Sequence, residues 1–212
     1  MPTISVEQNL IAKLLAKHNL EHNVEQIADE LPLLGTDIDR CDKQILDIEI
    51  FPNRPDLLSG ETLTRAVRNF VHRQPAQPTI DTVSGKITLV VEPELAKIRP
   101  VILGAVVRNV DYASIGISAD AFIKSLMDHQ EKLHFALGRG RKRASIGVHD
   151  LAKLSPPFSV KAVSGDTMFT PLAATEPMSI SQVLAEHPKG IDYAHLLEGF
   201  DKYPIIVDGE NN

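Results

Sequence analysis

The pattern of apolar and polar residues predicts a mixture of short helices and strands in the first third of the chain. Residues 2–6 are β-prone, and residues 44–51 alternate between apolar and acidic side chains, as in a half-buried strand. Apolar residues recur at helical spacing after Ser5, Asn23 and Ser59, and serine and asparagine both cap helix N-termini. Residues 33–39, which precede the predicted strand 44–51, are expected to be a loop or an irregular strand.

The longest predicted elements lie in the middle of the chain. Residues 101–110 form a nearly continuous apolar run, which is typical of a central strand buried on both faces. Ser118 begins the longest predicted helix, which ends near Leu137 and is followed by glycines at 138 and 140. The apolar stripe expected to be buried on this helix consists of Phe122, Leu126, Leu133 and Leu137.

Shorter predicted elements flank this region. We expect strands over 86–92, 144–148, 158–163, 168–172 and 203–207, the third and fourth pairing with each other, and helices over 179–186 and 191–198. Asp208-Gly209 carries the signal of a tight hairpin, yet three residues follow it. We therefore expect the second half of the chain to be an incomplete domain, interrupted within a motif.

The proline-containing stretch 74–85 is expected to be a linker between two domains. The predicted fold class is α+β, with a small αβ module over residues 1–75 and a truncated, mixed-sheet domain over residues 86–212. At 212 residues, the chain is long enough for two small cores.

Composition restricts the classes of function. Apolar residues at 43% and charged residues at 24% are ordinary for a globular protein, and the net charge of −6 excludes nucleic-acid binding over the whole surface. The single cysteine, Cys41, cannot form an internal disulfide. The sequence begins without a signal peptide and contains no apolar run near the roughly 18 residues of a membrane span, so we expect a soluble cytoplasmic protein.

A dense group of cations follows the longest predicted helix. Arg139, Arg141, Lys142 and Arg143 lie within five residues, interleaved with glycine. One interpretation is structural, because cations after a helix C-terminus complement its dipole. The other is a local contact with nucleic-acid phosphates, which basic side chains on a glycine-rich turn can approach closely.

His149 and Asp150 follow a short apolar run and form the main candidate for chemistry. An imidazole at the rim of a sheet could orient a water molecule, whereas the structural alternative is a histidine bonded to a backbone carbonyl. Ser145 lacks the Gly-x-Ser-x-Gly elbow of the hydrolases that use a serine nucleophile.

Two further motifs favour structural roles. His18 and His22 match the His-x-x-Glu-His pattern of a group of zinc peptidases, but the pattern lies at a fading helix end and is expected to be a solvated polar surface. Residues 53–56, Asn-Arg-Pro-Asp, are expected to form a rigid turn. No phosphate-binding Gly-x-x-x-x-Gly-Lys-Ser/Thr loop is present.

Several blocks together resemble the N-terminal part of the β subunit of phenylalanyl-tRNA synthetases, of the archaeal and eukaryotic cytosolic type. They keep their order over nearly the whole chain, and each block alone is a weak signal. The blocks are Met-Pro-Thr-Ile-Ser-Val at 1–6, Phe-Pro-Asn-Arg-Pro-Asp-Leu-Leu-Ser at 51–59, Ala-Lys-Ile-Arg-Pro at 96–100, Val-Arg-Asn at 107–109, Arg-Lys-Arg at 141–143, Ile-Gly-Val-His-Asp-Leu at 146–151 and Tyr-Pro-Ile-Ile-Val-Asp at 203–208.

The resemblance implies a subunit of an aminoacyl-tRNA ligase that charges tRNA(Phe) using ATP and Mg²⁺, with neither cofactor and no metal bound by this part. It implies an α subunit as partner, in an α2β2 assembly. The domain beginning near residue 86 would be the editing domain, which hydrolyses mischarged Tyr-tRNA(Phe). His149 would lie in its pocket with Asp150 orienting it, and Arg141, Lys142 and Arg143 would contact RNA or support the structure. Pro156 and Ala152 depart from the family pattern.

Two alternatives remain open. One is a non-catalytic RNA-binding or assembly module, for which salt-sensitive tRNA binding through Arg141, Lys142 and Arg143 is the discriminating property. The other is a free-standing hydrolase, which the interrupted hairpin disfavours.

Overall fold

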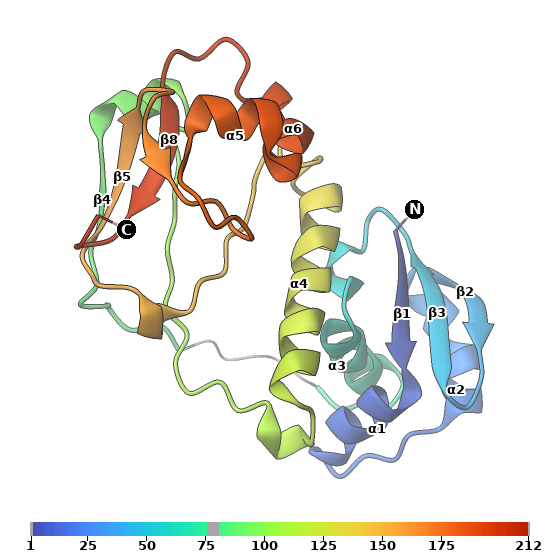
Figure 1. Ribbon diagram of the computed structural model, residues 1–212. Coiled ribbons are helices and arrows are strands. Elements are labelled where there is room, and N and C mark those ends of the chain that lie inside the picture. Colours follow the sequence, from blue (N-terminus) through green and yellow to red (C-terminus); the bar gives the residue numbers. More distant parts are fainter. Residues whose placement is uncertain (1, 76–80, 212) are drawn as a thin grey trace. The chain divides into compact units, whose positions relative to one another are not determined.

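The computed structural model describes residues 2–75 and 81–211, which form two compact units (Figure 1). The first unit comprises Met1–Asp81 and Asn109–Gly147, and the second comprises Thr82–Arg108 and Val148–Asn212. Helices and small sheets occur in both units, which confirms the predicted α+β class.

The first unit contains a three-stranded antiparallel sheet with the order β1-β3-β2. Its strands are β1 (Thr3–Glu7), β2 (Thr36–Cys41) and β3 (Ile45–Ile50). The central strand is β3, whose alternate residues Leu46, Ile48 and Ile50 are fully buried, as the alternation in the sequence predicts. Strand β2 lies largely within the segment that was expected to be a loop or irregular strand.

Three helices complete the core of this unit. They are α1 (Gln8–Ala16), α2 (Val24–Glu30) and α3 (Gly60–Phe70), and α1 and α3 pack against each other. Asn23 and Ser59 cap α2 and α3 as predicted. The predicted cap at Ser5 is wrong, because β1 runs through Ser5, and its hydroxyl donates to Asp47 Oδ1 on the neighbouring strand at 2.5 Å.

Helix α4 (Ala119–Ala136) belongs to the first unit, although residues 86–212 were predicted to form one continuous domain. Ser118 caps the helix, as expected. Ser125 Oγ donates to Glu61 Oε1 of α3 at 2.7 Å, and Lys132 Nζ donates to the Thr3 carbonyl of β1 at 2.6 Å. Figure 1 shows α4 running beside α3, and Leu133 packs against the core.

The second unit contains a mixed three-stranded sheet of β4 (Leu89–Val91), β5 (Phe158–Val163) and β8 (Tyr203–Val207). Strand β5 is parallel to β4 and antiparallel to β8. Strands β6 (Met168–Phe169) and β7 (Met178–Ser179) pair with each other. The predicted pairing of 158–163 with 168–172 is therefore wrong, because β4 and β8 occupy the two edges of β5, and β6 pairs with β7 instead.

Short helices fill the remaining connections. The α-helices of the second unit are α5 (Ile180–Glu186) and α6 (Pro188–Tyr193). The 3-10 turns are η1 (Leu31–Leu34), η2 (Pro55–Leu57), η3 (Pro93–Lys97), η4 (Ala113–Ile115), η5 (Leu151–Lys153) and η6 (Ala194–Leu196).

The predicted buried strand over 101–110 is not formed. Most of its apolar side chains face solvent, with Leu103 90% and Val107 78% exposed, and the segment over 144–148 is likewise not a strand. A strand requires a partner for its backbone N–H and C=O groups. Among residues 2–75 and 81–211, no strand pairs with either segment. An apolar run in the sequence therefore indicates a tendency to be buried. Whether the run is buried depends on another segment of the protein that pairs with it or covers it.

Candidate functional site

The cation cluster lies on a tight turn directly after α4. The carbonyl oxygen of Leu133 accepts from the backbone N–H of Gly138 at 2.9 Å. The carbonyl oxygen of His134 accepts from the N–H of Gly140 at 2.9 Å and from that of Arg141 at 3.4 Å. The turn therefore folds back over the helix end, and backbone amides satisfy carbonyl groups of the last helical turn.

The backbone of this turn adopts an unusual conformation. Arg139, Gly140 and Arg141 have φ values of 51°, 62° and 67°, so three consecutive residues are left-handed. A residue other than glycine in this region costs about 1–3 kcal/mol, and such residues cluster at functional sites. Gly138 has a different constraint, because a Cβ atom there would lie 2.5 Å from the Ala144 carbonyl oxygen.

A buried histidine holds the turn from inside. The imidazole of His134 is only 5% exposed, and its Nε2 accepts the backbone N–H of Ile146 at 2.7 Å. Nδ1 faces Glu131 Oε1 at 3.3 Å, and Arg141 Nη2 donates to the same carboxylate oxygen at 2.5 Å.

We call Glu131, His134 and Arg141 the latch. Arg141 Nε also lies 3.0 Å from His134 Nδ1, and the side chain of Arg141 is only 19% exposed. The latch connects α4 to both the middle of the turn, at Arg141, and its far end, at Ile146. A turn with three left-handed residues is thereby held in one conformation.

The structure separates cations that the sequence analysis treated as one group. Lys142 and Arg143 are exposed, and so is Arg139, which belongs to the cation cluster but not to the Arg-Lys-Arg block of the family resemblance. Within the described ranges, none of these three forms a salt bridge, whereas Arg141 pairs with Glu131. Sequence analysis also missed His134, although Glu131 and His134 are three residues apart and hence on one face of a helix.

His149 and Asp150, the predicted chemical pair, lie in the second unit and are exposed. The carboxylate of Asp150 accepts the backbone N–H of Ala152 at 3.1 Å and caps η5. No hydrogen bond joins Asp150 to His149 in the part of the chain that the structure describes. The role of His149 in editing stays a prediction.

The turn at residues 53–56 is held by a bidentate ion pair. Arg54 Nε and Nη2 donate to the two carboxylate oxygens of Asp56 at 2.9 and 2.8 Å, and Arg54 also donates to the Leu34 carbonyl. The hydrogen bonds from Arg54 lower the pKa of Asp56, and the same bonds raise the pKa of Arg54. These contacts agree with the structural interpretation of this motif.

The two histidines of the peptidase-like motif have separate partners. His18 contacts Arg68 Nη1, and His22 Nε2 lies 2.9 Å from Gln8 Oε1. Across residues 2–75 and 81–211, no group of three or more histidine, cysteine, aspartate or glutamate side chains is placed to hold a metal ion.

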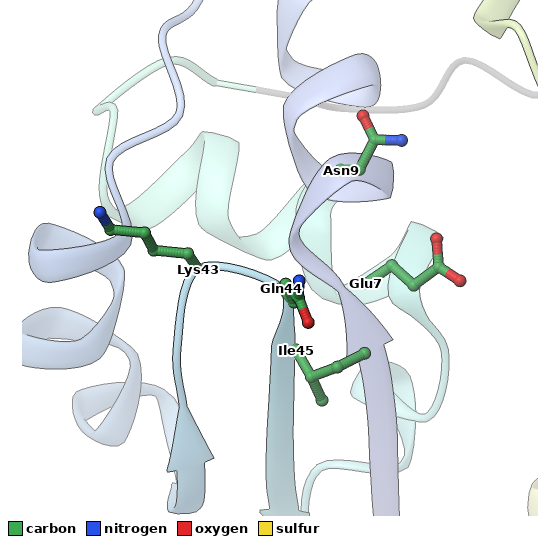
Figure 2. A pocket seen from close by; sticks show the side chains of 5 residues that line it. All are labelled: Glu7, Asn9, Lys43, Gln44 and Ile45. Carbon is green, nitrogen blue, oxygen red and sulfur yellow. The ribbon is translucent and has the colours of Figure 1, made fainter.

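A shallow surface depression lies where α1 begins. It is lined by Glu7, Asn9, Lys43, Gln44 and Ile45 (Figure 2). Lys43 and Glu7 extend in different directions, so the depression lacks the converging polar groups expected of a ligand site. Of the helices that the structure describes, none is sufficiently long and apolar to cross a membrane.

Comparison with known proteins gives a consistent result. No family model matches the chain. It is 42% identical over all 212 residues to the phenylalanine–tRNA ligase β subunit of Methanosarcina barkeri, covering 37% of that protein, and 43% identical over 186 residues to that of Methanococcoides burtonii, covering 88% of this chain and 33% of the relative. The chain thus spans about a third of the length of these relatives.

A solved structure shares the fold. A crystal structure of an N-terminal fragment of the phenylalanyl-tRNA synthetase β subunit from Pyrococcus horikoshii matches the whole chain with a TM-score of 0.81. The sequence identity is 24%, and the match covers 60% of that fragment.

Proposed function

Because the chain is homologous to the N-terminal part of phenylalanine–tRNA ligase β subunits, we propose that it serves as this part of such a subunit. The observation that carries the proposal is the 42% identity to the Methanosarcina barkeri subunit over every residue of this chain. On this proposal the chain works with an α subunit in an α2β2 enzyme that charges tRNA(Phe) in the cytoplasm. ATP and Mg²⁺ would be used by the assembled enzyme, outside this chain.

The first test of this proposal is assembly. The chain, carrying an affinity tag, is produced together with the α subunit of an archaeal phenylalanine–tRNA ligase, and recovery of the α subunit is compared with that from an unrelated tagged protein. Stoichiometric recovery supports a place in the ligase. Failure of the complete β subunit to recover the α subunit under the same conditions would contradict the proposal.

The finer proposal is hydrolytic editing of Tyr-tRNA(Phe), with His149 as the group that activates water. Its neutral imidazole would accept a proton as water attacks the ester carbonyl carbon. The bond from that carbon to the ribose oxygen then breaks, and the proton passes to the ribose oxygen. Support comes from the block Val148–Leu151, which resembles the family's editing segment, and from the solvent exposure of His149.

The test measures hydrolysis of preformed Tyr-tRNA(Phe) by the complete enzyme and by its His149→Ala variant. We expect the variant to lose about 100-fold or more in rate, because general acid–base catalysis typically contributes that much. His195→Ala is the matched control, since His195 is another exposed histidine of the same unit. Unchanged hydrolysis in His149→Ala would remove His149 from the mechanism while leaving the ligase assignment intact.

The alternative is a non-catalytic module that binds RNA or assembles the enzyme. The observation favouring it is the exposed cation turn, because phosphate contacts need no catalytic group. If neither this chain nor the complete subunit hydrolyses Tyr-tRNA(Phe), while α-subunit and tRNA binding persist, the alternative replaces editing.

A further inference from the structure

Resting on the proposed role at tRNA, we infer that the turn 138–146 is a preformed clamp for the RNA sugar–phosphate backbone. Arg139, Lys142 and Arg143 make the phosphate contacts. The latch of Glu131, His134 and Arg141 positions them and does not touch the RNA. In a simple basic stretch all four cations would contact the RNA in the same way. Here three cations contact the RNA, and Arg141 acts only by positioning them.

The first argument is charge. The protein carries a formal net charge of −6, so a polyanion approaches it only where cations are concentrated and unneutralised. Arg141 is neutralised by Glu131. In the described structure Arg139, Lys142 and Arg143 are exposed and have no acidic partner, which leaves three positive charges within five residues.

The second argument concerns helix capping, the simplest structural explanation for the cations. Cations after a helix can stabilise the unsatisfied carbonyl groups at its C-terminus. Here the carbonyls of Leu133 and His134 already accept backbone amides of the turn. Capping of these groups therefore does not explain why the side chains of Arg139, Lys142 and Arg143 are basic.

The third argument is conformation. Arg139 and Arg141 occupy left-handed positions at which glycine would be unstrained, so the sequence retains arginine against a conformational cost. For Arg141 the structure supplies the reason, since its side chain forms the latch. For the side chain of Arg139, no hydrogen bond or ion pair with another described residue offsets the cost, which points to an external partner.

The fourth argument concerns preorganisation. Long basic side chains on a mobile loop lose conformational freedom when they bind, which weakens affinity. The latch fixes the backbone of the turn from both Arg141 and Ile146, and so reduces that loss. Phosphate oxygens suit arginine, which offers paired N–H donors, and lysine, which offers a compact charge.

The experiment measures the affinity of the 212-residue chain for tRNA(Phe) at salt concentrations from 50 to 200 mM. Each phosphate contact contributes roughly 0.7–0.9 to the slope of log affinity against log salt. Three contacts predict that affinity falls about 20- to 40-fold over this range. The triple variant Arg139→Gln, Lys142→Gln, Arg143→Gln should bind weakly and almost independently of salt.

Single variants separate contact from positioning. Arg139→Gln, Lys142→Gln and Arg143→Gln should each weaken binding and lower the slope by roughly 0.7–0.9. Arg141→Gln should weaken binding and leave the slope near that of the wild type, because three contacts remain. Lys124→Gln is the matched control, since Lys124 is an exposed lysine on α4 outside the turn.

A double-mutant cycle tests the latch directly. Glu131→Gln and Arg141→Gln should weaken tRNA binding by similar factors, and the double variant by little more than either one, because both break the same connection. An Arg141→Gln variant with the slope of Arg143→Gln would make Arg141 a phosphate contact and overturn the division of roles. If Glu131→Gln or Arg141→Gln lowers the melting temperature of the chain but leaves its affinity for tRNA unchanged, the latch does not position the phosphate contacts.

The outcomes also separate this inference from the proposed function. If the wild-type chain binds tRNA with the expected salt dependence while the triple variant binds equally well, the clamp is refuted and the proposed function stands. If neither the wild-type chain nor the complete subunit binds tRNA, the proposed role at tRNA fails, and the clamp fails with it.

Discussion

The two glycines of the cation turn permit a sharp test of how its backbone is held. Gly138 has no room for a side chain, because an added Cβ would meet the Ala144 and His134 carbonyl oxygens at 2.5 and 2.6 Å. Gly140 has open space around it, but its φ is +62°. Gly138→Ala therefore introduces a steric conflict with backbone, whereas Gly140→Ala introduces only conformational strain.

The magnitudes differ enough to be measured. A left-handed alanine costs about 1–2 kcal/mol, partly offset by the lower entropy of the unfolded chain, so we expect about 1 kcal/mol for Gly140→Ala. Overpacking costs about 1–3 kcal/mol, and backbone oxygens cannot rotate aside as side chains do, so we expect roughly 3 kcal/mol for Gly138→Ala. Both losses should be confined to the turn.

The assay is hydrogen exchange at the Ile146 amide, which is bonded to His134 and thus reports opening of the turn. The expected accelerations are about 5-fold for Gly140→Ala and roughly 100-fold for Gly138→Ala, since 1.4 kcal/mol is a factor of ten. The Leu63 amide, bonded to the Ser59 carbonyl in α3, is the internal control and should be unaffected.

Two results would refute this reasoning. Equal acceleration in both variants would mean that the close approach at Gly138 does not constrain the turn. Faster exchange at Leu63 as well would mean that the turn and the core of the unit open together, and that the effect is global.

Two further predictions concern the first unit. Ser59→Ala should lower the free energy of unfolding, measured by urea denaturation, by about 1 kcal/mol. The substitution removes the capping box of α3, in which Ser59 Oγ accepts the Thr62 N–H at 3.2 Å. Ser59→Asp, which retains a capping oxygen, should keep most of the stability. Burial, followed by the charge of His72, lowers the pKa of His22, and His22 Nδ1 is buried with no hydrogen-bond partner in the described structure. The folded state therefore binds this proton less readily than the unfolded state, so stability should be full above about pH 6.5 and decline as the pH falls below it. His22→Gln should flatten that decline in urea titrations between pH 7 and 5, and an unchanged pH profile would rule out His22 as its source.

Features set by neighbouring residues could be predicted from the sequence. Asn23, Ser59 and Ser118 cap helices because each side chain reaches a backbone amide three residues away, at distances fixed by the chain itself. Strand β3 was predictable because its alternation matches a sheet with one dominant core face. The family resemblance, carried by blocks in a fixed order, agrees with the relatives found.

The cation turn was only half predictable. The glycines and cations stand out in the sequence, but the burial of His134 and the inward pairing of Arg141 depend on how the turn folds back onto α4. For the same reason the sequence alone placed Arg139, Arg141, Lys142 and Arg143 in one group, whereas in the structure Arg141 pairs inward with Glu131 and the other three are exposed. Side chains adjacent in sequence can have opposite exposure once the backbone turns.

The sequence by itself thus determined the caps of α2, α3 and α4, the central strand β3 and the α+β class, because these rest on short-range hydrogen bonds and on apolar periodicity. Only the tertiary structure decided that residues 101–110 are exposed, that β5 pairs with β4 and β8, and that α4 joins the first unit. Strand pairing and helix docking depend on partners distant in the chain, and local patterns do not specify which partner is present.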